Sequence, residues 1–187
     1  MNQPAPMSTV ETRPFPLRWP LALLAGALAV ALAAQVSIPL SFSVVPMTLQ
    51  GPAVLLVGGL LGSAAGAGAL VLYLLLGLFG APVFAGGASG PAHLVGPTAG
   101  YLLAFPVAAL AVGRVAERGR LGRSLAGALF GLAIIHIGGW SWLAILTGDP
   151  ARAFAVGTAP FVLQDLLKAL LAGLVLWRAH HALRLRA

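Results

Sequence analysis

The sequence predicts an all-α membrane protein with six transmembrane helices and both termini in the cytoplasm. Hydrophobic residues make up 59% of its 187 residues and charged residues only 8%, whereas a soluble domain carries about 25% charged residues. No Asp, Glu, Lys or Arg occurs from Trp19 to Gly113, a stretch long enough for several crossings of about 20 residues each. The apolar runs are continuous rather than alternating, which favours helices over a β-barrel.

Composition also excludes several function classes. The net charge of +7 does not indicate nucleic-acid binding, because the basic residues lie between apolar runs instead of forming a stripe interleaved with aromatics. Basic residues in those places orient a membrane protein. The high apolar content excludes a disordered chain. The chain has no Cys, so it has neither a thiolate metal site nor a cysteine nucleophile.

The elements follow from the apolar runs. Residues 1–18 hold four Pro and the first charges, and we expect a disordered cytoplasmic tail there. The transmembrane domain is predicted over 19–178 and a basic cytoplasmic tail over 179–187. The apolar runs cover, in order, 19–36, 48–80, 99–113, 124–146 and 160–177. A cleaved signal peptide is an alternative interpretation of the first run, since arginines precede an apolar core that ends in small residues.

The run at 48–80 is too long for one crossing and short for two, at about 50 Å of helix. Its glycines, at 58–59 and 62–68, suit a tight turn between two short helices. With one crossing, three arginines lie inside and seven outside. With two crossings, nine lie inside and one outside, which the positive-inside bias strongly favours. The sequence therefore predicts six helices.

Small residues recur every fourth position on the first helix, at Ala25, Ala29 and Ala33. This spacing allows another helix to approach closely. The neighbour is either a helix of the same chain or a separate membrane subunit, and spacing alone leaves both interpretations open.

Asp165 and Lys168 are the only acid and the only lysine inside any apolar run. Charges in a bilayer are costly and mark a site or a neutralising pair. Positions i and i+3 share a helix face, and the predicted topology places both residues in the outer half of the membrane. An acid and a base in an outward cavity suit a small ligand with N–H donors and an anionic group.

Other polar and aromatic side chains are secondary candidates for this cavity. The loop at 81–97 is semi-apolar and is expected either to act as a lid or to pack on the bundle. We interpret His136, in the middle of a helix, as a hydrogen-bonded core residue, with a proton carrier as the alternative. The further candidates are Gln50, Tyr73, His93, Tyr101, Trp140, Trp142 and Gln164.

No cofactor or metal is expected. No His and carboxylate cluster has metal-ligand spacing, and the G-x-x-x-x-G-K-[ST] loop that binds ATP phosphates is absent because Leu167 precedes the only lysine.

Four segments resemble the BioY family, the biotin-binding S component of energy-coupling factor (ECF) transporters. They are PMTLQ at 46–50, GLLG to FAGG at 59–87, GPTAGYLLAF at 96–105 and PFVLQDLLKALLA at 160–172. The resemblance covers about residues 19–178. It implies six transmembrane helices, biotin bound near the outer face, and a plasma (inner) membrane of prokaryotic type.

The resemblance also implies site residues and partners. Asp165 is expected to accept a ureido N–H of biotin, and Lys168 to pair with its carboxylate. Ala25, Ala29 and Ala33 are expected to contact a transmembrane coupling protein, with ATP-binding subunits supplying energy. The expected substrate-binding residues are Gln50, Phe84, Gly86, Gly87, His93, Thr98, Tyr101, Gln164, Asp165 and Lys168.

Biotin capture without catalysis is therefore the predicted function. The alternatives are an S component for another vitamin or a metal ion, an intramembrane enzyme with Asp165 and His136 as an acid–base pair, and a membrane scaffold in which Asp165 and Lys168 only neutralise each other.

Overall fold

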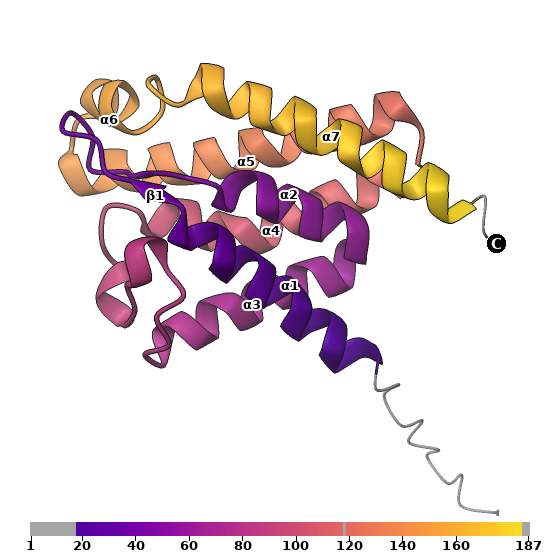
Figure 1. The fold of residues 1–187 in the computed structure, drawn as a ribbon. Coiled ribbons are helices and arrows are strands. Elements are labelled where there is room, and N and C mark those ends of the chain that lie inside the picture. The colour runs from indigo at the N-terminus through magenta and orange to yellow at the C-terminus, as the bar shows by residue number, and fades with distance from the viewer. Residues whose placement is uncertain (1–17, 118, 185–187) are drawn as a thin grey trace, which may run out of the picture.

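The structure is a computed structural model and describes residues 18–117 and 119–184. Its helices pack into one bundle (Figure 1). The elements are α1 Arg18–Gln35, β1 Ser37–Ile38, β2 Met47–Thr48, α2 Gln50–Leu61, α3 Ser63–Leu78, the short 3-10 turns η1 Ala85–Gly87 and η2 Pro91–Leu94, α4 Ala99–Ala116, α5 Leu121–Thr147, α6 Pro150–Gly157 and α7 Val162–Arg184. The all-helical class is as predicted, with β1 and β2 forming only a two-residue antiparallel pair.

The long run at 48–80 divides into α2 and α3, as the glycine cluster predicted. The break lies at Gly62, whose φ of 83° is readily adopted only by glycine. A Cβ at Gly113 of α4 would overlap the backbone of Ser63, so α4 packs directly against this turn. The α2–α3 turn therefore lies beside the far end of α4, away from Thr98.

The lengths of the helices support several membrane crossings. Within the described residues, α1, α4 and α5 are each long and apolar enough to span a bilayer, and α6 with α7 forms a fourth candidate span bent by 58°. The helices α2 and α3 are apolar but shorter, at 12 and 16 residues. Six crossings and the side of each terminus stay predictions.

The two ends of the bundle differ. The start of α1 and the end of α7 lie at one end with the α2–α3 and α4–α5 turns, and α6 and the loops at 36–49 and 79–98 lie at the other (Figure 1). Residues 1–17 of the predicted tail at 1–18 lie outside the described residues, as do 185–187, and Arg18 is the first residue of α1. Residues 179–184 continue α7 as a helix.

The bundle has a small core and a broad apolar surface. Tyr73, Leu55, Leu70 and Leu176 are almost completely buried. Many large aliphatic and aromatic side chains face outward, among them Leu21, Leu32, Phe79, Ile145 and Leu163. An apolar surface of this extent suits lipid.

Candidate ligand cavity

A cavity of about 320 Å³ opens at the loop end of the bundle, within the range typical of small-molecule sites. Its wall comes from the α1–α2 loop, the α3–α4 loop, and the neighbouring turns of α2, α4, α5 and α7. The lining side chains are mostly apolar. They belong to Val44, Val45, Pro46, Thr48, Gln50, Gly51, Phe84, Ala85, His93, Pro97, Thr98, Tyr101, Leu102, Phe105, Ile135, His136, Gly157, Phe161, Gln164 and Asp165.

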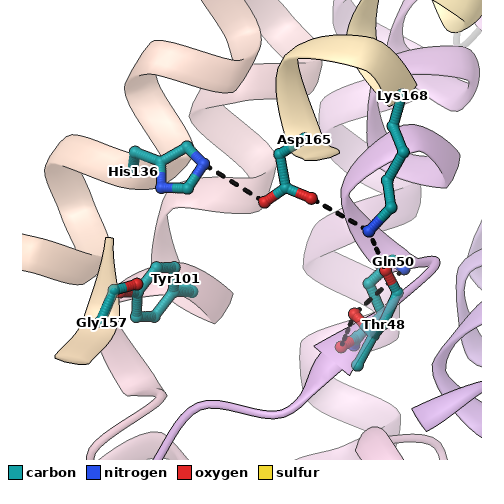
Figure 2. Close-up of polar contacts among 7 residues, drawn as sticks. All are labelled: Thr48, Gln50, Tyr101, His136, Gly157, Asp165 and Lys168. Carbon is teal, nitrogen blue, oxygen red and sulfur yellow. Dashed lines mark hydrogen bonds and ion pairs between the residues drawn. The ribbon is translucent and has the colours of Figure 1, made fainter. Parts of the chain in front are cut away.

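Asp165 is the acidic group of this wall, and two basic side chains contact it (Figure 2). Its Oδ1 lies 3.0 Å from Nζ of Lys168, one turn further along α7. Its Oδ2 lies 3.3 Å from Nε2 of His136 on α5. Contacts on both oxygens fix the orientation of the carboxylate and offset the cost of a charge in a largely apolar site.

Lys168 itself does not line the cavity. Its Nζ donates to Oδ1 of Asp165 at 3.0 Å and to the backbone oxygen of Thr48 at 3.1 Å. The ammonium thus joins α7 to the segment that precedes α2. In this arrangement Lys168 holds the acid rather than facing the cavity.

A second, uncharged network borders the cavity on the α2 side. The side-chain amide of Gln50 donates to the hydroxyl of Tyr73 at 2.6 Å, and that hydroxyl donates to the backbone oxygen of Val83 at 3.1 Å. Gln50 and Tyr73 are buried. These hydrogen bonds join α2 to α3 and α3 to the α3–α4 loop. They therefore fix the position of this loop beside Phe84.

Tyr101 closes the cavity between α4 and α6. Its hydroxyl donates to the backbone oxygen of Gly157 at 2.6 Å. A Cβ at Gly139 of α5 would overlap the Tyr101 ring, so glycine at this position makes room for it. The ring is thereby held from both α5 and the last residue of α6.

Most of the residues that the sequence predicted as substrate-binding meet in this wall: Gln50, Phe84, His93, Thr98, Tyr101, Gln164 and Asp165. Gly86 and Gly87 are exposed beside it, and only Phe84 and Ala85 of that segment line the cavity. Among the secondary candidates, Tyr73 is buried behind the wall, and the indoles of Trp140 and Trp142 donate to backbone oxygens of Pro150 and Gly96.

Sequence reasoning missed several features of the site. We interpret His136 from the sequence as a hydrogen-bonded core residue and, in one alternative, as the acid–base partner of Asp165; in the structure it lines the cavity and contacts Asp165. The segment between the predicted apolar runs at 124–146 and 160–177 contains the helix α6, and Asp149 followed by Pro150 is a helix start signal there. The Asp149 carboxylate does cap α6, accepting from the backbone N–H of Arg152 at 2.9 Å.

The alanine stripe of α1 faces outward. Ala25 and Ala29 are exposed and Ala33 is half-buried, whereas Ala27 and Ala31 pack in the core. Within the chain, α1 approaches α3 closely through another face, where a Cβ at Gly26 would overlap Ala69 of α3. Ala25 and Ala29 are therefore open to a neighbour from outside the described part of the chain, whereas Ala33 is partly covered.

Comparison with known proteins gives consistent matches. The BioY family model matches residues 7–185. The probable biotin transporter BioY of Pyrococcus horikoshii is 43% identical over 142 residues, covering 76% of this chain and 83% of that protein. The biotin transporter BioY of Thermotoga maritima is 41% identical over 146 residues, covering 78% and 85%.

A solved structure shares the fold. The crystal structure of an S-component for biotin from an ECF-type ABC transporter superposes with a TM-score of 0.79 at 24% identity. The match covers 88% of this chain and 92% of that one. The arrangement of helices described above is therefore that of a known S-component fold.

Proposed function

The chain belongs to the BioY family, and we propose that it captures biotin at the outer face of a membrane as the substrate-binding component of an ECF transporter. The relatives above are named as biotin transporters, which supports a transport role rather than catalysis. The observation that carries the proposal is an apolar cavity whose wall contains one carboxylate held by two basic side chains.

The chemistry of biotin fits this wall. Its ureido ring offers two N–H donors and a carbonyl, and its valerate chain ends in a carboxylate. We propose that Asp165 accepts a ureido N–H, that Gln164 and Gln50 add amide contacts, and that Phe84, Tyr101 and Thr98 surround the ring system. Gln164 supports this role because its buried side-chain nitrogen has no hydrogen-bond partner in the described part of the chain. His93 and the backbone at Gly86 and Gly87 are proposed to contact the ligand from the loop.

The proposed topology has six crossings with both termini cytoplasmic in a plasma (inner) membrane of prokaryotic type. The start of α1 and the end of α7 lie at the same end of the bundle, which supports an even number of crossings. In this orientation the cavity faces outward, and the basic α4–α5 turn faces inward, as the positive-inside bias requires.

The proposed partners are a transmembrane coupling protein and ATP-binding subunits. The outward alanine stripe supports docking of the coupling protein on α1. Ala29→Leu is expected to abolish biotin uptake in cells that contain the whole transporter, because the larger side chain separates the helices. Biotin binding by the purified variant is expected to stay unchanged, and a loss of binding would contradict this assignment.

Direct measurement of biotin binding to detergent-solubilised protein tests the function. Asp165→Asn is expected to weaken binding by about 1–3 kcal/mol, or roughly 5–150-fold, because the ligand N–H loses a charged acceptor. Asp149→Asn is the matched control, since this exposed acid only caps α6 and Asn caps equally well. Absence of biotin binding by the unmodified chain, or equal effects of the two variants, would refute the proposal.

A further inference from the structure

The cavity wall contains a histidine whose role the family resemblance does not specify. His136 lies in the middle of α5, lines the cavity and has Nε2 3.3 Å from Oδ2 of Asp165 (Figure 2). Both of its ring nitrogens are buried, and Nδ1 has no hydrogen-bond partner among residues 18–117 and 119–184. Its side chain is only 13% exposed. Histidine is the side chain that ordinarily changes charge between about pH 5 and pH 8.

We propose that His136 takes up a proton when an anionic ligand enters the cavity, and that it then holds Asp165 while Lys168 turns to the ligand carboxylate. His136 is a positioning residue in this scheme, since it acts through Asp165 and through its charge. The inference rests on the proposed function for the identity of the ligand, biotin, whose aliphatic carboxylic acid is ionised at neutral pH.

The charge balance of the site supports this proton uptake. With His136 neutral, Asp165 and Lys168 cancel each other, and a carboxylate added to the cavity leaves one net negative charge in apolar surroundings. An uncompensated charge in such a site costs several kcal/mol. One proton on His136 restores a neutral set of four groups: two carboxylates, one ammonium and one imidazolium.

The present positions of the side chains explain why His136 is needed. Nζ of Lys168 donates hydrogen bonds to Asp165 and to the backbone oxygen of Thr48, and Lys168 does not line the cavity. Because Lys168 lies outside the cavity wall, it must move to meet a ligand carboxylate, and this movement weakens its contact with Asp165. The aspartate then needs another cation within reach, and Nε2 of His136 is already beside its second oxygen.

Other titratable groups around α5 do not supply this charge. The helix α7 presents Asp165 and Lys168, and α4 presents Tyr101, whose hydroxyl donates to the oxygen of Gly157. The helix α2 contains no titratable residue, and Arg152 of α6 is exposed. The other imidazole in the cavity wall is His93, whose Nδ1 lies 3.1 Å from the backbone oxygen of Ser89.

The test is the pH dependence of biotin affinity of the purified full chain, between about pH 6 and pH 8.5. A neutral His136 must be protonated on binding, so affinity is highest at low pH and is lost as the pH rises, by up to about tenfold per pH unit. Biotin methyl ester, which has no charge, is expected to bind with a much flatter profile. Calorimetry in two buffers of different ionisation enthalpy should register uptake of about one proton per biotin.

His136→Gln is expected to remove the slope, so that its affinity at low pH falls about tenfold or more below that of the unmodified chain while the two converge at high pH. His93→Gln is the matched control and should keep the slope, whatever its absolute affinity. Buffer calorimetry on the unmodified chain decides the question even if His136→Gln fails to fold.

Three results would overturn the proton linkage. They are a pH-independent affinity with no proton uptake, an equal slope for the methyl ester, and a slope that survives in His136→Gln, which would place the proton on another group such as Asp165. In each of these the chain still binds biotin and the proposed function stands. A chain that binds biotin at no pH would refute the proposed function and this inference together.

Discussion

The two polar networks beside the cavity differ in how completely their atoms are paired. On the α2–α3 side, Gln50, Tyr73 and the backbone of Val83 form an uncharged chain. On the α5–α7 side, His136, Asp165 and Lys168 form a charged cluster, and next to it Gln164 and His136 keep nitrogens without a hydrogen-bond partner in the described chain. The uncharged chain fixes a loop, whereas the charged cluster retains capacity to bind a ligand.

The position of each network along the chain fits this division. The uncharged chain joins adjacent elements, α2, α3 and the loop that follows, so it stabilises one part of the fold. The charged cluster joins α7 to α5 and, through Lys168, to the residues before α2. A ligand that changes the cluster therefore acts on three segments that are far apart in the sequence.

The largest predicted effect comes from leaving a charge of the cluster unpaired. Asp165→Ala is expected to abolish biotin binding and to lower the unfolding free energy by about 3 kcal/mol, because Lys168 remains in the bundle without its counter-ion. The double variant Asp165→Ala with Lys168→Met should regain most of the stability and none of the binding. Thermal unfolding in detergent and a biotin-binding assay measure both quantities. Equal stability of the single and double variants would contradict the compensation.

The uncharged network should behave differently. Tyr73→Phe leaves the amide of Gln50 without its acceptor and the oxygen of Val83 without its donor, at a cost of about 1–3 kcal/mol in unfolding free energy. Replacing both side chains, with Gln50→Leu added, should cost less than the sum of the single variants, because no buried polar side chain is then left alone. If the changes in unfolding free energy of the two single variants add up fully in the double variant, the two residues are not coupled.

A substitution that disturbs the packing of α5 against the Tyr101 ring should have a smaller effect on stability and binding. Gly139→Ala places a methyl group against the Tyr101 ring, and we expect a loss of about 1–2 kcal/mol of stability together with weaker biotin binding. Gly122→Ala on the same helix is the control, since a Cβ there meets no atom within 4 Å. That variant should be as stable as the parent or slightly more stable. If Gly139→Ala binds biotin as the parent does, the position of the Tyr101 ring does not matter for binding.

The sequence predicted the parts of the molecule that depend on composition and spacing. The charge-free stretch and the glycines near Gly62 indicated the helices, and a lone acid in an apolar run indicated Asp165. The sequence could not predict that Lys168 contacts Asp165 and Thr48 without lining the cavity, because an i, i+3 spacing fixes a shared face and not the rotamers. It named His136 and Asp165 together only in the alternative of an acid–base pair, and their contact could not be predicted because it depends on how α5 and α7 pack. The short apolar span of α6 carries no membrane signal, and only its capping residue, Asp149, marked it.

The smallest predicted effect concerns the α3–α4 loop that the uncharged network holds. The indole of Trp142 on α5 donates to the backbone oxygen of Gly96 at 2.9 Å, which ties the α3–α4 loop to the same helix that carries His136. Trp142→Phe keeps a ring and removes this bond, so the loop should open more readily, at a cost of about 1 kcal/mol. Biotin should then dissociate about fivefold faster, with little change in association.

Trp140→Phe supplies the matched control for this last effect. Its indole makes a comparable bond, 3.0 Å to the oxygen of Pro150, but it joins α5 to α6 and not to the loop over the cavity. Dissociation kinetics after dilution should therefore separate the two variants, although each loses one indole N–H. Equal dissociation rates would mean that the bond to Gly96 does not restrain the loop, and that the uncharged network from Gln50 to Val83 closes the cavity without help from α5.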